Sequence, residues 1–65
     1  MKLVSIYCSS LAGLHARVNE VGFADKLLGI TSDQGGGHWA VFRLTETDLA
    51  VWLEHFPNPR PTVLS

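Results

Sequence analysis

Apolar and polar residues change their spacing several times along the 65-residue chain, and each spacing predicts a different element. Residues 2–7 (KLVSIY) are rich in β-branched and aromatic side chains and contain no Gly, Pro, Asn or Asp, which favours a β-strand. Residues 27–32 (LLGITS) and 38–44 (HWAVFRL) are also β-prone and predict a second and a third strand. The connection between them, 33–37 (DQGGG), is short and glycine-rich and predicts a β-hairpin.

A helical spacing follows the first strand. Ser9 or Ser10 offers an N-cap, and Gly22 suits the left-handed position after the last turn. Between these ends, the apolar residues lie three, four and three positions apart, which is the repeat of one helix face. They are Leu11, Leu14, Val18 and Val21.

A second helix is predicted after the third strand. Thr45 is its natural N-cap, and Asp48, three residues later, completes a capping box with a shorter acid than usual. Pro57 ends the helix because proline cannot continue the backbone hydrogen bonds. The apolar face of this helix is expected to consist of Leu49, Trp52, Leu53 and Phe56.

The chain length allows a single domain, residues 1–65. Residues 57–65 form a proline-rich tail that we expect to be extended, because a residue before proline avoids the α region. Residues 62–64 can add a short edge strand. The predicted order, βαββα with an optional last β, is the connectivity of a ferredoxin-like sandwich. This is an α+β fold in which two helices cover one face of an antiparallel sheet.

Strand alternation divides the side chains between the two faces of that sheet. We expect the helix-covered face to hold Val4, Ile6, Leu28, Ile30, Ala40, Phe42 and Leu44. The first and third strands are expected to be antiparallel neighbours, which places Tyr7 beside Trp39 on the uncovered face. Trp, Tyr and Arg dominate binding hot spots, so this face is the predicted partner-binding surface. Its candidate residues are Tyr7, Leu27, Trp39, Val41 and Arg43.

Composition excludes several classes of protein. Five Lys and Arg against six Asp and Glu give a formal charge of −1, which argues against a strongly basic nucleic-acid binder. A single cysteine excludes an internal disulfide and a zinc site with two cysteine ligands. No apolar run approaches the ~20 residues that span a bilayer, so we expect no membrane association. The apolar stretch 3–14 is broken by polar residues and is followed by no clear cleavage site of a secretory signal, so we expect an intracellular protein.

The residues with reactive side chains form no catalytic or metal-binding motif. Cys8 lies where a strand meets a helix, and we interpret it as a small buried residue, its reactivity being left open. His15, His38 and His55 belong to three different elements and lack the spacing of metal ligands. No cofactor, metal or enzymatic activity is therefore expected.

A short chain of this kind is typical of small regulatory or inhibitory proteins. We expect it to bind another protein, most concretely as a phage-type inhibitor that blocks a nucleic-acid-binding effector of a bacterial defence complex, as anti-CRISPR proteins do. In that case it acts inside the infected bacterial host. One alternative is a dimeric or ligand-responsive regulatory domain, so the chain is expected to be a monomer or a homodimer. The second alternative is a single-stranded nucleic-acid binder that uses the uncovered sheet face, although Arg43 is the only cation assigned to it.

Overall fold

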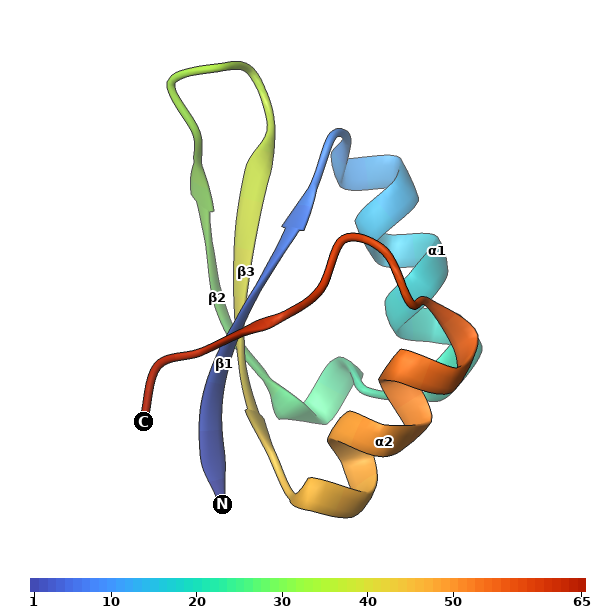
Figure 1. Cartoon of the computed structure of the whole chain (residues 1–65). Helices are drawn as coiled ribbons and strands as arrows, with labels where there is room; N and C mark the ends of the chain where they lie inside the picture. The colour runs from blue at the N-terminus through green and yellow to red at the C-terminus, as the bar shows by residue number, and fades with distance from the viewer.

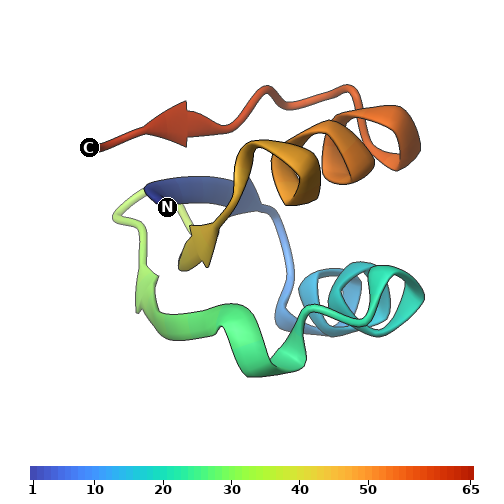
Figure 2. The same ribbon diagram turned by 90° about the horizontal axis from the view of Figure 1, so that it is seen from below.

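Strands and helices alternate in the order β-α-β-β-α-β in the computed structural model, which describes residues 1–65. The strands form one four-stranded antiparallel sheet in the order β2-β3-β1-β4. Figures 1 and 2 show both helices on the same side of this sheet. The elements are β1 (Lys2–Cys8), α1 (Leu11–Val21), the 3-10 turn η1 (Ala24–Lys26), β2 (Leu27–Ser32), β3 (His38–Leu44), α2 (Glu46–His55) and β4 (Thr62–Val63).

Both ends of α1 are capped as the sequence predicts. The Ser10 Oγ accepts a hydrogen bond from the Gly13 N–H at 3.1 Å. Gly22 follows the last turn with φ of 71°, a left-handed conformation that glycine adopts without steric cost. The Phe23 N–H then donates to the Val18 carbonyl at 3.0 Å, so the chain turns back toward the sheet and Phe23 enters the core.

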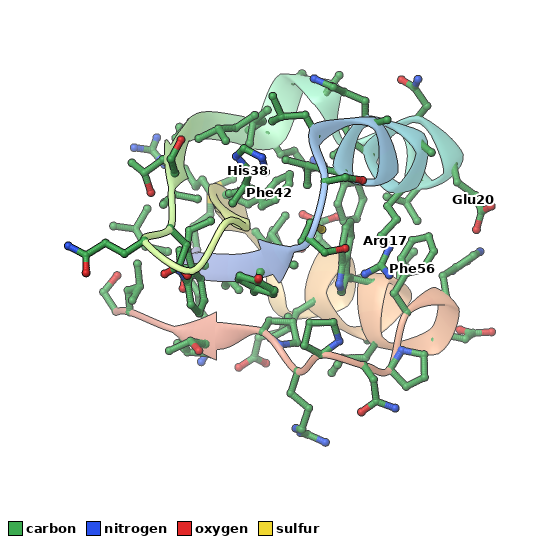
Figure 3. The ribbon with its side chains drawn as sticks, turned by 90° about the horizontal axis from the view of Figure 1, so that it is seen from above. Arg17, Glu20, His38, Phe42 and Phe56 are labelled. Carbon is green, nitrogen blue, oxygen red and sulfur yellow. The ribbon has the colours of Figure 1, made fainter.

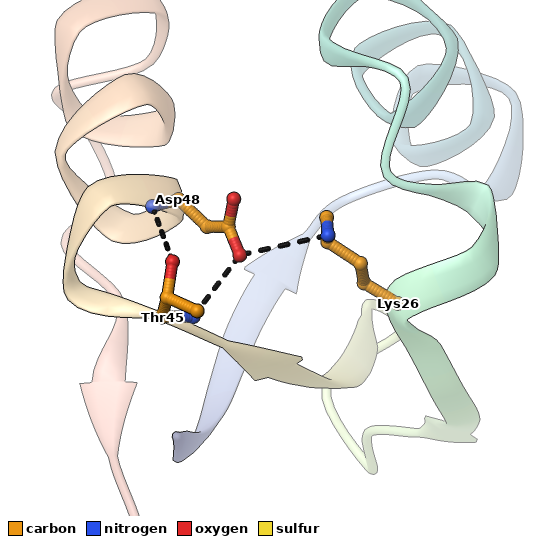
Figure 4. A network of polar contacts seen from close by, with 3 residues as sticks. All are labelled: Lys26, Thr45 and Asp48. Carbon is orange, nitrogen blue, oxygen red and sulfur yellow. Dashed lines mark hydrogen bonds and ion pairs between the residues drawn. The ribbon is translucent and has the colours of Figure 1, made fainter.

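The start of α2 is fixed by a reciprocal capping box (Figure 4). The Asp48 N–H donates to Thr45 Oγ1 and the Thr45 N–H donates to Asp48 Oδ2, both at 3.0 Å. The Lys26 Nζ lies 3.6 Å from the same carboxylate oxygen, which ties the helix start to η1. The hydrogen bond from the Thr45 backbone is the main reason that the pKa of the Asp48 carboxyl lies below its ordinary value, and the Lys26 charge lowers that pKa further.

The core lies between the sheet and the two helices. Trp52 of α2 is fully buried at its centre, with its ring centroid 4.9 Å from that of Phe56 and 5.8 Å from that of Phe42. The cluster confirms the predicted inward set on β1 and β3. Its ten buried members are Val4, Ile6, Cys8, Leu14, Val18, Phe23, Ala40, Phe42, Leu44 and Trp52.

The predicted faces of the two leucines in β2 are wrong. We expected Leu28 to face the core and Leu27 to face outward, but Leu28 is 53% exposed and Leu27 is half-buried against the core. The cause is an irregularity in the pairing of β2: Leu27 lies opposite Phe42, whereas Gly29 lies opposite Val41. The extra residue in β2 shifts the alternation by one position, so Leu27 belongs to the helix side of the sheet.

Smaller differences concern the ends of elements. β1 extends one residue beyond the predicted strand, to Cys8, and β4 has two residues, Thr62–Val63, in place of the expected three. Leu11 was expected on the apolar face of α1 but is 43% exposed. The tail is not extended throughout, because it bends at the cis Asn58–Pro59 peptide before reaching β4. Neither helix is long and apolar enough to cross a membrane.

Candidate protein-binding surface on the open sheet face

The sheet has one face that carries no helix, which we call the open face. Residues paired across an antiparallel sheet point to the same side, so the register of the strands assigns its members. Starting from the pair Tyr7 and Trp39, the register gives Leu3, Ser5, Tyr7, Thr31, Trp39, Val41, Arg43 and Thr62. Four of the five predicted binding residues therefore share this face, and the fifth, Leu27, does not.

Tyr7 and Trp39 form an aromatic pair at one end of the open face. They are direct neighbours in the register of β1 and β3, as predicted. Their ring centroids are 5.3 Å apart and the ring planes meet at 65°, an edge-to-face geometry that aromatic pairs favour. Both side chains are half-buried, so each keeps a part of its surface in contact with solvent.

Residues of the β2–β3 hairpin fix the position of both rings of this pair. The Asp33 Oδ1 accepts a hydrogen bond from the Trp39 Nε1–H at 3.2 Å, while Oδ2 accepts from the Gly35 N–H at 2.9 Å. The buried Gly37 lies directly against the Tyr7 ring, where a Cβ atom would overlap the phenol. The aromatic pair is therefore fixed in place before any partner arrives, which lowers the entropy lost on binding.

The charges near the open face are separated toward its two ends. Asp33 lies beside Trp39 at the hairpin end, and Arg43 lies at the opposite end of β3, where it is exposed. The ion pairs of the molecule are Lys2 with Glu46 and Lys26 with Asp48. Neither Asp33 nor Arg43 has an ionic partner, so both are available to a second molecule.

The middle of the open face is apolar or small. Ser5 is only 8% exposed because it lies on a central strand between Val41 of β3 and Thr62 of β4. Leu3 is half-buried, and the adjacent Leu64, whose N–H donates to the Leu3 carbonyl at 2.7 Å, is 54% exposed. Apolar surface thus connects the aromatic pair to the Arg43 end.

Cys8 lies on the opposite side of the sheet, in the core. It is 6% exposed, and burial raises the pKa of its thiol above the ordinary value of 9.0, although the nearby Arg17 charge opposes that shift. The buried position confirms the structural interpretation of this cysteine. A thiol kept neutral in this way is a poor nucleophile.

Arg17 occupies a position that the sequence analysis did not single out. Its guanidinium lies over the Phe56 ring, 5.2 Å from the centroid, so it bridges α1 and α2 (Figure 3). The helical spacing could have predicted this inward position, because Arg17 is three residues after Leu14 and therefore shares the inward face of α1. Its Nη1 atom is buried without a hydrogen-bond partner, and so is the Trp52 Nε1 atom.

The remaining candidate residues do not converge. His15 lies on α1, His38 on β3 and His55 on α2, and no three metal-binding side chains come together. The acidic residues Asp33 and Asp48 lie at opposite ends of β3, so they form no common patch.

Of the surfaces of this molecule, the open face has the most features of a protein-binding surface. It combines a fixed aromatic pair, an apolar middle and two charged groups without ionic partners. Compared with protein-family models, curated proteins and solved structures, the chain shows no match.

Proposed function

We propose that this chain is a binding protein without enzymatic activity that associates with another protein through the open face. The observation that carries the proposal is the Tyr7–Trp39 pair, which Asp33 and Gly37 hold in one geometry on a surface that the helices leave uncovered. Large aromatic side chains with little freedom left to lose are the usual anchors of protein interfaces. Arg43, exposed at the other end, adds a second residue type that is enriched in hot spots.

The most concrete form of this function is inhibition. A small, rigid α+β domain can cover a surface of a larger assembly and block access to it by steric exclusion alone. We propose a phage-type inhibitor of a bacterial defence complex, comparable to anti-CRISPR proteins, whose target is an effector that itself binds nucleic acid. The order of the elements and of the strands supports a ferredoxin-like arrangement as the scaffold.

Two other functions remain candidates. A dimeric regulatory domain is favoured by the separated charges of Asp33 and Arg43, which make the two ends of the open face complementary to each other. Binding of single-stranded nucleic acid is favoured by the aromatic pair, on which bases could stack, but Arg43 is the only cation among the open-face residues. Such binding would weaken steeply with salt, and neutralising Arg43 would weaken it further.

Capture from a bacterial lysate tests the proposal when three forms of the chain are immobilised side by side. Trp39→Ala removes one ring of the aromatic pair, whereas His15→Ala alters an exposed residue of α1 and serves as the matched control. We expect a defined protein to be retained by the wild type and by His15→Ala. Trp39→Ala should lose affinity for it by about 30-fold, the equivalent of ~2 kcal/mol for a hot-spot ring. Equal retention by all three forms would refute the proposal.

A further inference from the structure

The open face carries opposite charges at its two ends. Asp33 adjoins Trp39 at the hairpin end, and Arg43 follows Trp39 by four residues on β3, which corresponds to about 13 Å along a strand. Neither charge has an ionic partner within the chain. A surface with this pattern is complementary to a copy of itself that runs in the opposite direction.

We propose that two copies of this chain pair open face to open face, with Arg43 of each copy against the Tyr7–Trp39 pair and Asp33 of the other. The inference rests on the proposed function in that it uses the same surface. The free protein then dimerises reversibly as its concentration rises, and the target protein competes with the second copy for the open face.

The charges select one of the two symmetric ways to stack these sheets. A two-fold axis parallel to the strands would place Arg43 at the same end as the Arg43 of the second copy, which is repulsive. A two-fold axis that lies between the sheets and crosses the strands reverses their direction, so each Arg43 meets the end that carries Asp33. Self-complementary contacts of this kind are the rule in symmetric dimers.

The contacting groups suit one another chemically. Each oxygen of the Asp33 carboxylate accepts a single hydrogen bond within the chain, so lone pairs remain for the forked N–H groups of a guanidinium. The ring faces of Tyr7 and Trp39 attract a cation by their quadrupoles. The chain already contains two contacts of this type, Arg17 over Phe56 and Lys26 over Phe23. At the centre of the interface Val41 supplies apolar contact, and Leu3 adds to it beside Arg43.

The size of the open face limits the strength of this dimer. Strands of seven, six, seven and two residues, at about 3.3 Å per residue and about 4.8 Å apart, give a footprint of roughly 350 Å² per copy. This is well below the roughly 800 Å² per partner of a standard stable interface. We therefore expect a reversible dimer that forms at tens to hundreds of micromolar (an order-of-magnitude range) rather than a permanent one.

The experiment is sedimentation velocity at protein concentrations from about 10 μM to 1 mM. It compares the wild type with variants in which the charge of Arg43 or of Asp33 is reversed. Arg43→Glu alone and Asp33→Lys alone each place like charges at both contacts, and each should weaken dimerisation by tenfold or more. An equimolar mixture of the two variants places opposite charges at both contacts, so a mixed dimer should reappear. His15→Glu, on the exposed side of α1, should leave dimerisation unchanged.

Asp33 also supports the hairpin, so circular dichroism must show that Asp33→Lys is folded. If it is not, Thr31→Lys supplies the cation instead, because Thr31 is exposed on the open face opposite Trp39. A wild type that is monomeric up to 1 mM overturns the inference, as does a dimer insensitive to both charge reversals. Neither result affects the lysate capture, whose dependence on Trp39 tests the proposed function separately.

Discussion

The Tyr7 ring lies so close to the backbone of Gly37 that a Cβ atom at Gly37 would overlap it. This contact joins the end of β1 to the turn of the β2–β3 hairpin. It also explains why the last residue of the glycine-rich connection is buried while the three residues before it are exposed. The position of the aromatic pair on the open face therefore depends on a residue without a side chain.

Gly37→Ala should accordingly destabilise the protein by about 1–3 kcal/mol, because the added methyl group forces the Tyr7 ring to move. In a Tyr7→Ala background the same substitution should cost much less, since the overlapping ring is gone. Urea denaturation of the four proteins of this double-mutant cycle measures the coupling. An equal cost of Gly37→Ala in both backgrounds would show that the overlap is unimportant.

Phe42 and Arg43 are consecutive residues with opposite roles. Phe42 is fully buried against Trp52, so Phe42→Ala should lower the free energy of unfolding by ~3–5 kcal/mol, most of the stability of so small a domain. Arg43 is exposed on the other face, and Arg43→Ala should change that free energy by no more than about 0.5 kcal/mol. Comparable losses for the two variants in urea denaturation would mean that the faces of β3 are assigned incorrectly.

Asp48 should make the stability of the protein depend on pH in the acidic range. Its pKa is lowered in the folded state, so its charged form stabilises the fold. That contribution is complete above the ordinary pKa of 3.8 and is lost as the pH falls through the lower folded value. We expect Asp48→Ala to be less stable than the wild type by about 1 kcal/mol at pH 6, because the capping box is lost.

Thermal unfolding of both proteins between pH 6 and pH 2 measures this effect. The difference between them should start to shrink as the pH falls below the ordinary pKa of 3.8, because the carboxyl then binds a proton in the unfolded chain before it does so in the folded protein. A difference that stays constant down to pH 2 would contradict a stabilising charge at this position.

Cys8 should be protected from thiol reagents in the folded protein. Burial raises the pKa of its thiol, so at neutral pH the reactive thiolate is scarce as well as inaccessible. We expect labelling by a chromogenic disulfide reagent to be slow in buffer and fast in urea. Because this pKa is raised on folding, stability should fall as the pH rises above the ordinary value of 9.0. Rapid labelling in buffer would place Cys8 outside the core.

Local chemistry made much of this fold predictable. Gly22 and the Thr45–Asp48 capping box each act within a few residues of chain, so the helix ends could be located from sequence alone. The antiparallel pairing of Tyr7 with Trp39 followed from the order of the elements, which leaves few ways to arrange three strands.

Features that depend on distant contacts could not be predicted. The extra residue in β2 places Leu27 on the helix side and leaves Leu28 exposed, and nothing within LLGITS other than its glycine indicates a bulge. The hydrogen bond from Trp39 to Asp33 spans the hairpin and requires a particular turn geometry. The stacking of Arg17 on Phe56 depends on how the two helices pack together.

Photo-crosslinking tests most directly whether the open face contacts a protein. A benzophenone amino acid replaces Val41, at the middle of the open face, and in a second protein it replaces Ala50, an exposed residue of α2. After irradiation in bacterial cells, we predict a crosslinked adduct from position 41, to a target protein or to a second copy, and none from position 50. Adducts from position 50 alone would contradict the account, because they would place the binding surface on the helices.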